Sequence, residues 1–170
     1  DRAGTIVGNY DGGNGMQINL EAYSKGRIRL HVNNGTEKFS TFFSSDIRSD
    51  RATHIAVTIE DKLATLYING VAKEKRTLSI SSLPQATENF VIGGDNRVGN
   101  TEYFKGAIYS VSLFSDIRTP QEIKSDMFAV CSGAAALPAG KLGKKFGRKK
   151  TIIAGLAIFL SAFVIFFGIF

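Results

Sequence analysis

The stretch His54-Ile55-Ala56-Val57-Thr58-Ile59, followed by Leu63-Ala64-Thr65-Leu66-Tyr67-Ile68, decides the fold class. Two runs of strand length, joined by the polar Glu60-Asp61-Lys62, predict a β-hairpin. Asn69-Gly70 follows at once, and both residue types tolerate the positive φ of a type I′ turn. The centre of the chain is therefore predicted to be antiparallel sheet.

Similar short runs recur on both sides of this hairpin, separated by Gly, Asn and Asp. They are Thr5–Gly8, Met16–Ala22, Arg27–Val32, Lys38–Phe43, Leu78–Ile80, Phe90–Ile92 and Ala107–Phe114. This rhythm predicts an all-β sandwich or barrel. Thr119-Pro120-Gln121-Glu122 predicts a helix start, with Thr119 as cap, and we expect a short helix to about Met127.

Charge is distributed unevenly along the 170 residues, whose net charge is +6. Residues 1–128 contain 15 basic and 15 acidic residues, so this part is neutral. The predicted β domain is therefore not expected to bind nucleic acid. Cys131 is the only cysteine, which excludes an intrachain disulfide and a cysteine-based metal site.

The composition changes after the β domain, which we place at residues 1–127. Residues 128–150 are small and then basic, and residues 151–170 carry no charge. Twenty apolar residues at 1.5 Å each give about 30 Å, so this last segment is predicted to be a transmembrane helix. The basic residues next to it are expected to attract membrane lipid headgroups. They are Lys141, Lys144, Lys145, Arg148, Lys149 and Lys150.

The β region resembles laminin G-like domains of the concanavalin A-like class. Thr53–Thr58 with Leu66–Gly70 resembles their central hairpin, and the run Phe90–Asn96 with Phe104–Phe114 resembles their last strands. The resemblance implies an antiparallel jelly-roll sandwich, and many members bind glycans or extracellular proteins. The family's opening strand usually precedes the region of residues 4–9, so we expect that first strand to be missing here.

A second resemblance, to major facilitator transporters, covers roughly residues 129–170. Gly140-Lys141-Leu142-Gly143-Lys144-Lys145-Phe146-Gly147-Arg148-Lys149 is similar to the G-x-L-x-D-x-x-G-R-K pattern between their second and third helices. Lys144 replaces the acidic residue of that pattern, which argues against transport activity. The location of the β domain stays open, because family resemblance implies the extracellular side whereas the positive-inside rule implies the cytoplasm.

Calcium is one candidate ligand, because laminin G-like domains often hold Ca²⁺ in their loops. Asp95 and Asn96 follow two glycines, and Asp11 and Asn14 lie in a second Gly-rich loop that is expected to converge with the first. Carboxylate and amide oxygens suit this hard cation. The alternative is that Asp, Asn and Gly only build turns here.

Glycan contact is the other candidate role of these loops. It needs aromatic platforms and hydrogen-bond donors. The candidates are Tyr10, Asn96, Arg97, Asn100 and Tyr103. Strand alternation also places Arg27, Arg29 and His31 on one face, which would suit a sulfated glycan. In both cases the alternative is an ordinary solvated surface.

Catalysis is not expected. Related glycoside hydrolases place two carboxylates on one strand face, usually as E-x-D-x-E, and the sequence has no such spacing. We therefore expect a non-catalytic recognition module that binds a glycan or protein, with Ca²⁺ as a candidate cofactor, tethered to a membrane. The alternatives are a transporter fragment with an appended sensory domain and, third, an inactive or divergent hydrolase-like domain.

Overall fold

The structure is a computed structural model. It describes residues 4–21, 26–45, 47, 51–84, 89–97, 99 and 102–129, except the side chains of residues 18–21. Asn100, the basic segment, the transporter-like motif and the apolar segment of residues 151–170 lie outside these ranges. Within them, no helix is long and apolar enough to cross a membrane.

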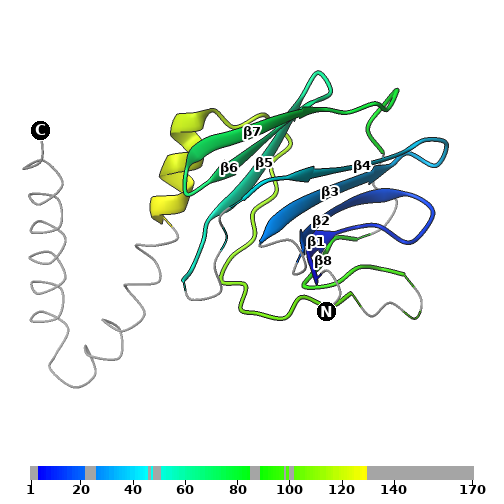
Figure 1. The fold of residues 1–170 in the computed structure, drawn as a ribbon, viewed down its shortest axis with the longest axis horizontal. Coiled ribbons are helices and arrows are strands. Elements are labelled where there is room, and N and C mark those ends of the chain that lie inside the picture. The colour runs from blue at the N-terminus through cyan, green and yellow to red at the C-terminus, as the bar shows by residue number, and fades with distance from the viewer. Residues whose placement is uncertain are drawn as a thin grey trace, which may run out of the picture. The chain divides into compact units, whose positions relative to one another are not determined.

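Among the described residues, eight strands form two antiparallel sheets in the unit that spans residues 1–124 (Figure 1). The strands are β1 (Gly4–Gly8), β2 (Gly15–Glu21), β3 (Arg27–Asn33), β4 (Lys38–Phe43), β5 (Ile55–Glu60), β6 (Leu63–Ile68), β7 (Val71–Thr77) and β8 (Val91–Ile92). One sheet has the order β4-β3-β2-β1-β8 and the other β5-β6-β7. This arrangement is consistent with the expected jelly roll.

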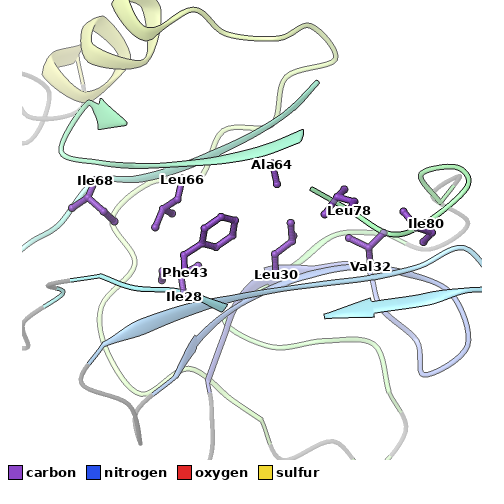
Figure 2. Close-up of a cluster of buried hydrophobic side chains, with 9 residues drawn as sticks. All are labelled: Ile28, Leu30, Val32, Phe43, Ala64, Leu66, Ile68, Leu78 and Ile80. Carbon is purple, nitrogen blue, oxygen red and sulfur yellow. The ribbon is translucent and has the colours of Figure 1, made fainter. Parts of the chain in front are cut away.

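The core lies between the two sheets. In β3, Ile28, Leu30 and Val32 are buried, whereas Arg27, Arg29 and His31 alternate with them on the opposite face. Figure 2 shows that these apolar side chains point towards the other sheet. They pack there with residues of β4, β6 and the segment after β7, namely Phe43, Ala64, Leu66, Ile68, Leu78 and Ile80. The alternation of β3 therefore fixes which face of the five-stranded sheet remains outside the core.

Both predicted hairpin turns are confirmed. Asp61 and Lys62 have φ of 44° and 68° between β5 and β6, and Asn69 and Gly70 have 51° and 75° between β6 and β7. β7 pairs with β6 along its whole length, although its sequence, VAKEKRT, gave no clear strand signal. Pairing with a buried neighbour therefore outweighs its polar composition.

Two predicted strands are wrong. Leu78 and Ile80 are buried but irregular, so their apolar alternation reflects packing into the core rather than pairing. Residues 107–114 are also irregular, and Tyr109, Leu113 and Phe114 are exposed. Alternation alone predicts a strand there, but within the described residues no neighbouring strand pairs with this segment.

The predicted helix start is confirmed. A helix spans residues 120–129, two residues beyond the predicted end. The N–H of Glu122 donates to Thr119 Oγ1 at 3.3 Å, and the N–H of Thr119 donates to Glu122 Oε2 at 2.9 Å. This reciprocal pair is a capping box, and Ile123, one turn into the helix, is buried.

Candidate recognition face on the five-stranded sheet

The side of the five-stranded sheet that faces away from the core, here called the outer face, is polar. Its register sets His31 of β3 opposite Ser40 of β4 and Gln17 of β2. Arg29 lies opposite Phe42 in the same way. Because directly paired residues point to the same side of a sheet, these side chains share one face. They are Gln17, Arg27, Arg29, His31, Lys38, Ser40 and Phe42.

The two Gly-rich loops, which the sequence predicts to converge, contact each other at the β1 side of this face. The N–H of Asn96 donates to the carbonyl of Tyr10 at 3.1 Å, which joins the loop after β8 to the loop after β1. Gly12 also lies against the Arg97 side chain, because a Cβ at Gly12 would be 3.4 Å from Arg97 Cγ. Tyr10 and Arg97 are therefore brought to the outer face together.

Arg97 is held over the sheet by two carboxylates. Its Nε and Nη2 donate to Asp95 Oδ2 at 2.8 and 2.6 Å, and Nη2 also lies 3.0 Å from Glu102 Oε2. The same Glu102 oxygen is 3.5 Å from Arg29 Nη2. Glu102 therefore links Arg97, in the loop after β8, to Arg29 of β3. The hydrogen bond to Asp95 raises the pKa of the Arg97 guanidinium, so Arg97 is charged at any physiological pH.

Asp95 is a buried anchor. Its side chain is 0% exposed, whereas that of Arg97 is 32% exposed. Gln17 Nε2 donates to Asp95 Oδ2 at 2.7 Å and to Thr5 Oγ1 at 2.8 Å. Gln17 of the sheet thus holds the Asp95 carboxylate in place. The carboxylate in turn fixes the position of Arg97 through charge-assisted hydrogen bonds.

The Tyr10 ring lies between Arg97 and His31 of β3 and contacts both. The Arg97 guanidinium carbon lies 5.4 Å from the centre of the Tyr10 ring, and the His31 and Tyr10 rings form a T-shaped pair with their centres 4.8 Å apart. On the far side of the face, Arg27 covers the Phe42 ring at 4.3 Å. Tyr10 and Phe42 therefore each have a guanidinium over one side of the ring.

The surroundings of His31 favour its neutral form. Burial lowers its pKa, and the nearby positive charges of Arg29, Lys38 and Arg97 lower it further, against the opposing effect of Glu102. His31 Nδ1 is 2.8 Å from Ser40 Oγ. Nε2 is buried and has no hydrogen-bond partner within the described part of the chain.

The side chains of the residues predicted to bind calcium all make hydrogen bonds or ion pairs within the protein. Asp11 Oδ1 accepts the N–H groups of Gly13 and Asn14, both at 2.8 Å, and this lowers the pKa of Asp11. Asn14 Oδ1 accepts the N–H of Gly15 at 2.8 Å, and Asn96 Nδ2 donates to the carbonyl of Asn89 at 2.7 Å. The described residues contain no group of three or more His, Cys, Asp or Glu placed to hold a metal ion.

The predicted glycan residues separate into two groups. Tyr10 and Arg97 reach the outer face, where they meet the Arg27, Arg29 and His31 row, so the two predicted surfaces form one. Tyr103 is 63% exposed beside Gly94 and forms an isolated parallel bridge with Thr5. Sequence reasoning missed Gln17 and Glu102; alternation along β2 indicates the position of Gln17, but no local signal marks Glu102.

A laminin G family profile, described as the concanavalin A-like lectin/glucanases superfamily, matches residues 1–124. The chain belongs to this superfamily. The match supports the laminin G-like resemblance and covers the unit that carries both sheets, but it does not extend to the transporter-like segment. A comparison with curated proteins finds no match.

Among solved structures, this superfamily member is similar to residues 221–444 of an S-layer domain-containing protein from Clostridium thermocellum. The identity is 24% and the TM-score 0.40, over 74% of this chain. The chain spans 63% of the length of that structure.

Proposed function

We propose that residues 1–124 form a non-catalytic recognition module that binds a saccharide across the outer face of the five-stranded sheet. The observation that carries this proposal is the joined cluster of Tyr10, His31, Arg29 and Arg97, in which loop and strand side chains meet on one sheet face outside the core. Planar guanidinium groups supply several fixed donors, which suits hydroxyl and anionic groups of a sugar.

The carboxylates of the outer face do not suit glycoside hydrolysis. Such a reaction needs a protonated carboxyl group on one side of the glycosidic bond that is broken and an ionised carboxylate on the other side. The side chain of Asp95 is fully buried, and both Asp95 and Glu102 contact the same Arg97 nitrogen. This arrangement fits carboxylates that position a guanidinium, and it supports binding rather than turnover.

We further propose that binding does not require Ca²⁺. A cation at the Asp95 carboxylate would have to displace the Arg97 guanidinium and the Gln17 amide. The melting temperature of the full-length chain should therefore be the same in millimolar Ca²⁺ as in EDTA. A ligand that binds only the folded state would raise the melting temperature. A calcium-dependent rise that disappears in Asp95→Ala would contradict this part of the proposal.

Attachment to a membrane through residues 151–170 remains a prediction of the sequence, as does the side on which the module lies. The transporter-fragment alternative depends on the same undescribed segment. Protease protection of the full-length chain in sealed vesicles tests both the attachment and the sidedness.

The binding proposal is tested by screening the detergent-solubilised full-length chain against immobilised saccharides. The informative variant is Arg27→Ala with Phe42→Ala, which removes a surface cation–ring pair without leaving the buried Asp95 unpaired. Lys75→Gln, on exposed β7 of the other sheet, is the matched control. We expect at least one saccharide class to bind, at least tenfold more weakly to the double variant. A cooperatively folded chain that binds no saccharide would contradict the proposal.

A further inference from the structure

We propose that the outer face selects anionic saccharides, which carry carboxylate or sulfate groups, and that their binding draws a proton onto His31. This inference depends on the saccharide-binding function proposed above and specifies its ligand class.

The coverage of the aromatic rings disfavours a neutral ligand. A neutral sugar binds aromatic residues mainly by stacking on an open ring. Arg97 lies over one side of the Tyr10 ring, the His31 ring packs against that ring in a T-shaped pair, and Arg27 lies over the Phe42 ring. These rings therefore orient guanidinium groups, whose planar forks match carboxylate and sulfate oxygens.

The charges of the outer face also favour an anion. The described side chains of the outer face include two carboxylates, those of Asp95 and Glu102. Both contact Arg97. The guanidinium of Arg27 packs on Phe42, and Lys38 is exposed at the start of β4. Asp95 and Glu102 come from the segment after β8, whereas Arg27, Arg29 and Lys38 lie on β3 and β4.

The positive side chains of β3 form a row. Arg27, Arg29 and His31 alternate along the strand, so consecutive members are about 7 Å apart and the row is about 13 Å long. A single small anion would reach only one or two of them. A linear saccharide with repeated negative charges, lying along β3, would reach all three.

His31 makes this binding sensitive to pH. Without ligand, burial and the charges of Arg29, Lys38 and Arg97 favour the neutral imidazole. An anionic group above the row offsets the charges of its neighbours Arg29 and Lys38 and so stabilises the protonated form of His31. Since the bound state then holds more protons than the unbound state, linkage requires that affinity rises as the pH falls.

The test measures binding of three probes to the full-length chain in detergent: a heparin octasaccharide, an oligogalacturonate of similar length, and a neutral cello-oligosaccharide. Titrations at pH 7.5 and 5.5, in two buffers that differ in ionisation enthalpy, also give the number of protons taken up. The basic residues after residue 140 contribute equally to all variants, so differences between variants report on the outer face.

We expect an anionic probe to bind about three- to tenfold more tightly at pH 5.5 than at pH 7.5, with net proton uptake. His31→Gln should abolish the pH dependence, so that the affinities of the variant at pH 5.5 and at pH 7.5 become about equal. Arg27→Gln should weaken binding at both pH values, and Lys75→Gln on β7 should not. Comparison of the two anionic probes shows whether sulfate or carboxylate is the preferred group.

Two results would overturn the inference and separate its failure from that of the proposed function. If the neutral probe binds as tightly as the anionic probes, the outer face is a saccharide site without charge selection. If pH dependence persists in His31→Gln, the proton is taken up elsewhere. If none of the three probes binds a folded chain, both the inference and the proposed function fail.

Discussion

Asp95 is the side chain on which the geometry of the site depends most. It is buried on the sheet and accepts hydrogen bonds from Arg97 and Gln17, so it sets where the guanidinium lies. An ion in this position stabilises the fold only while its partners remain, because an uncompensated buried charge is costly.

Asp95→Asn should therefore lower the free energy of unfolding by about 2–4 kcal/mol, because the Arg97 guanidinium loses its charged acceptor. Urea denaturation followed by circular dichroism measures the change. Asp11→Asn is the control, since asparagine also accepts the N–H bonds of that exposed turn and should leave stability unchanged. Equal losses in both variants would show that Asp95 does not act as an anchor.

His31 should make stability depend on pH. Its folded pKa is lowered, so the unfolded state binds more protons below the ordinary histidine pKa of about 6.5. The stability that His31 contributes is thus fully present above about pH 6.5 and is lost as the pH falls below it. We expect the melting temperature to decline less between pH 7.5 and 5.5 in His31→Gln than in the wild type. Parallel declines would contradict this.

Part of the site is predictable from residue patterns alone. The alternation of β3 places Arg27, Arg29 and His31 on one face, and the glycine-rich loops mark Tyr10 and Arg97. The contact between Glu102 and Arg29 is not predictable, because it joins residues 73 positions apart through an irregular loop. Long-range pairing of this kind depends on the complete topology.

Among the structural elements, the connection from β1 to β2 determines how Tyr10 reaches the outer face. Gly15 begins β2 with φ of 120°, and a Cβ there would lie 2.6 Å from the carbonyl oxygen of Asn9. Only glycine allows this close return of the chain. The local sequence indicated a loop, but the tight backbone contact follows from the β1–β2 register.

Gly15→Ala should therefore destabilise the chain by about 3 kcal/mol, because it adds a steric overlap to the cost of positive φ. Gly35→Ala is the matched control, since Gly35 has φ of 90° but no atom within 4 Å of the place a Cβ would take, and should cost about 1 kcal/mol. Thermal unfolding of both variants checks the difference. Similar losses would show that backbone conformation alone matters at Gly15.

Strand prediction succeeded where apolar alternation coincided with turn residues, as in β3, β5 and β6. It failed for residues 107–114, where the alternation is present but the described structure supplies no paired neighbour. It also failed for Leu78 and Ile80, which enter the core from an irregular segment. A sequence pattern indicates which side chains are buried, whereas strand pairing depends on the presence of a partner strand.

For the described part of the molecule, the five-stranded sheet has two roles. Its inner face forms part of the core, and its outer face carries the cluster of Tyr10, Arg29, His31 and Arg97. Phe42 and Phe43 illustrate this division, because adjacent residues of β4 point to opposite sides. Phe43 is 0% exposed against the three-stranded sheet (Figure 2), and Phe42 is 37% exposed under Arg27.

Phe43→Ala should cost about 3–5 kcal/mol of folding free energy, because it leaves a cavity between the sheets. Phe42→Ala should cost less than about 1.5 kcal/mol, while it weakens saccharide binding through Arg27. Denaturant unfolding and saccharide titration of the same two variants measure both effects. A larger stability loss in Phe42→Ala would reverse the assignment of the inner and outer faces.

The most direct test of the recognition face is whether a bound saccharide covers it. In a Cys131→Ser background, which removes the only native thiol, Ser40→Cys places a thiol on the outer face and Thr77→Cys places one on exposed β7. Thiol-labelling rates are then compared with and without the tightest-binding saccharide from the screen. We predict at least tenfold slower labelling at position 40 and no change at position 77. Protection at position 77 with none at position 40 would contradict the account.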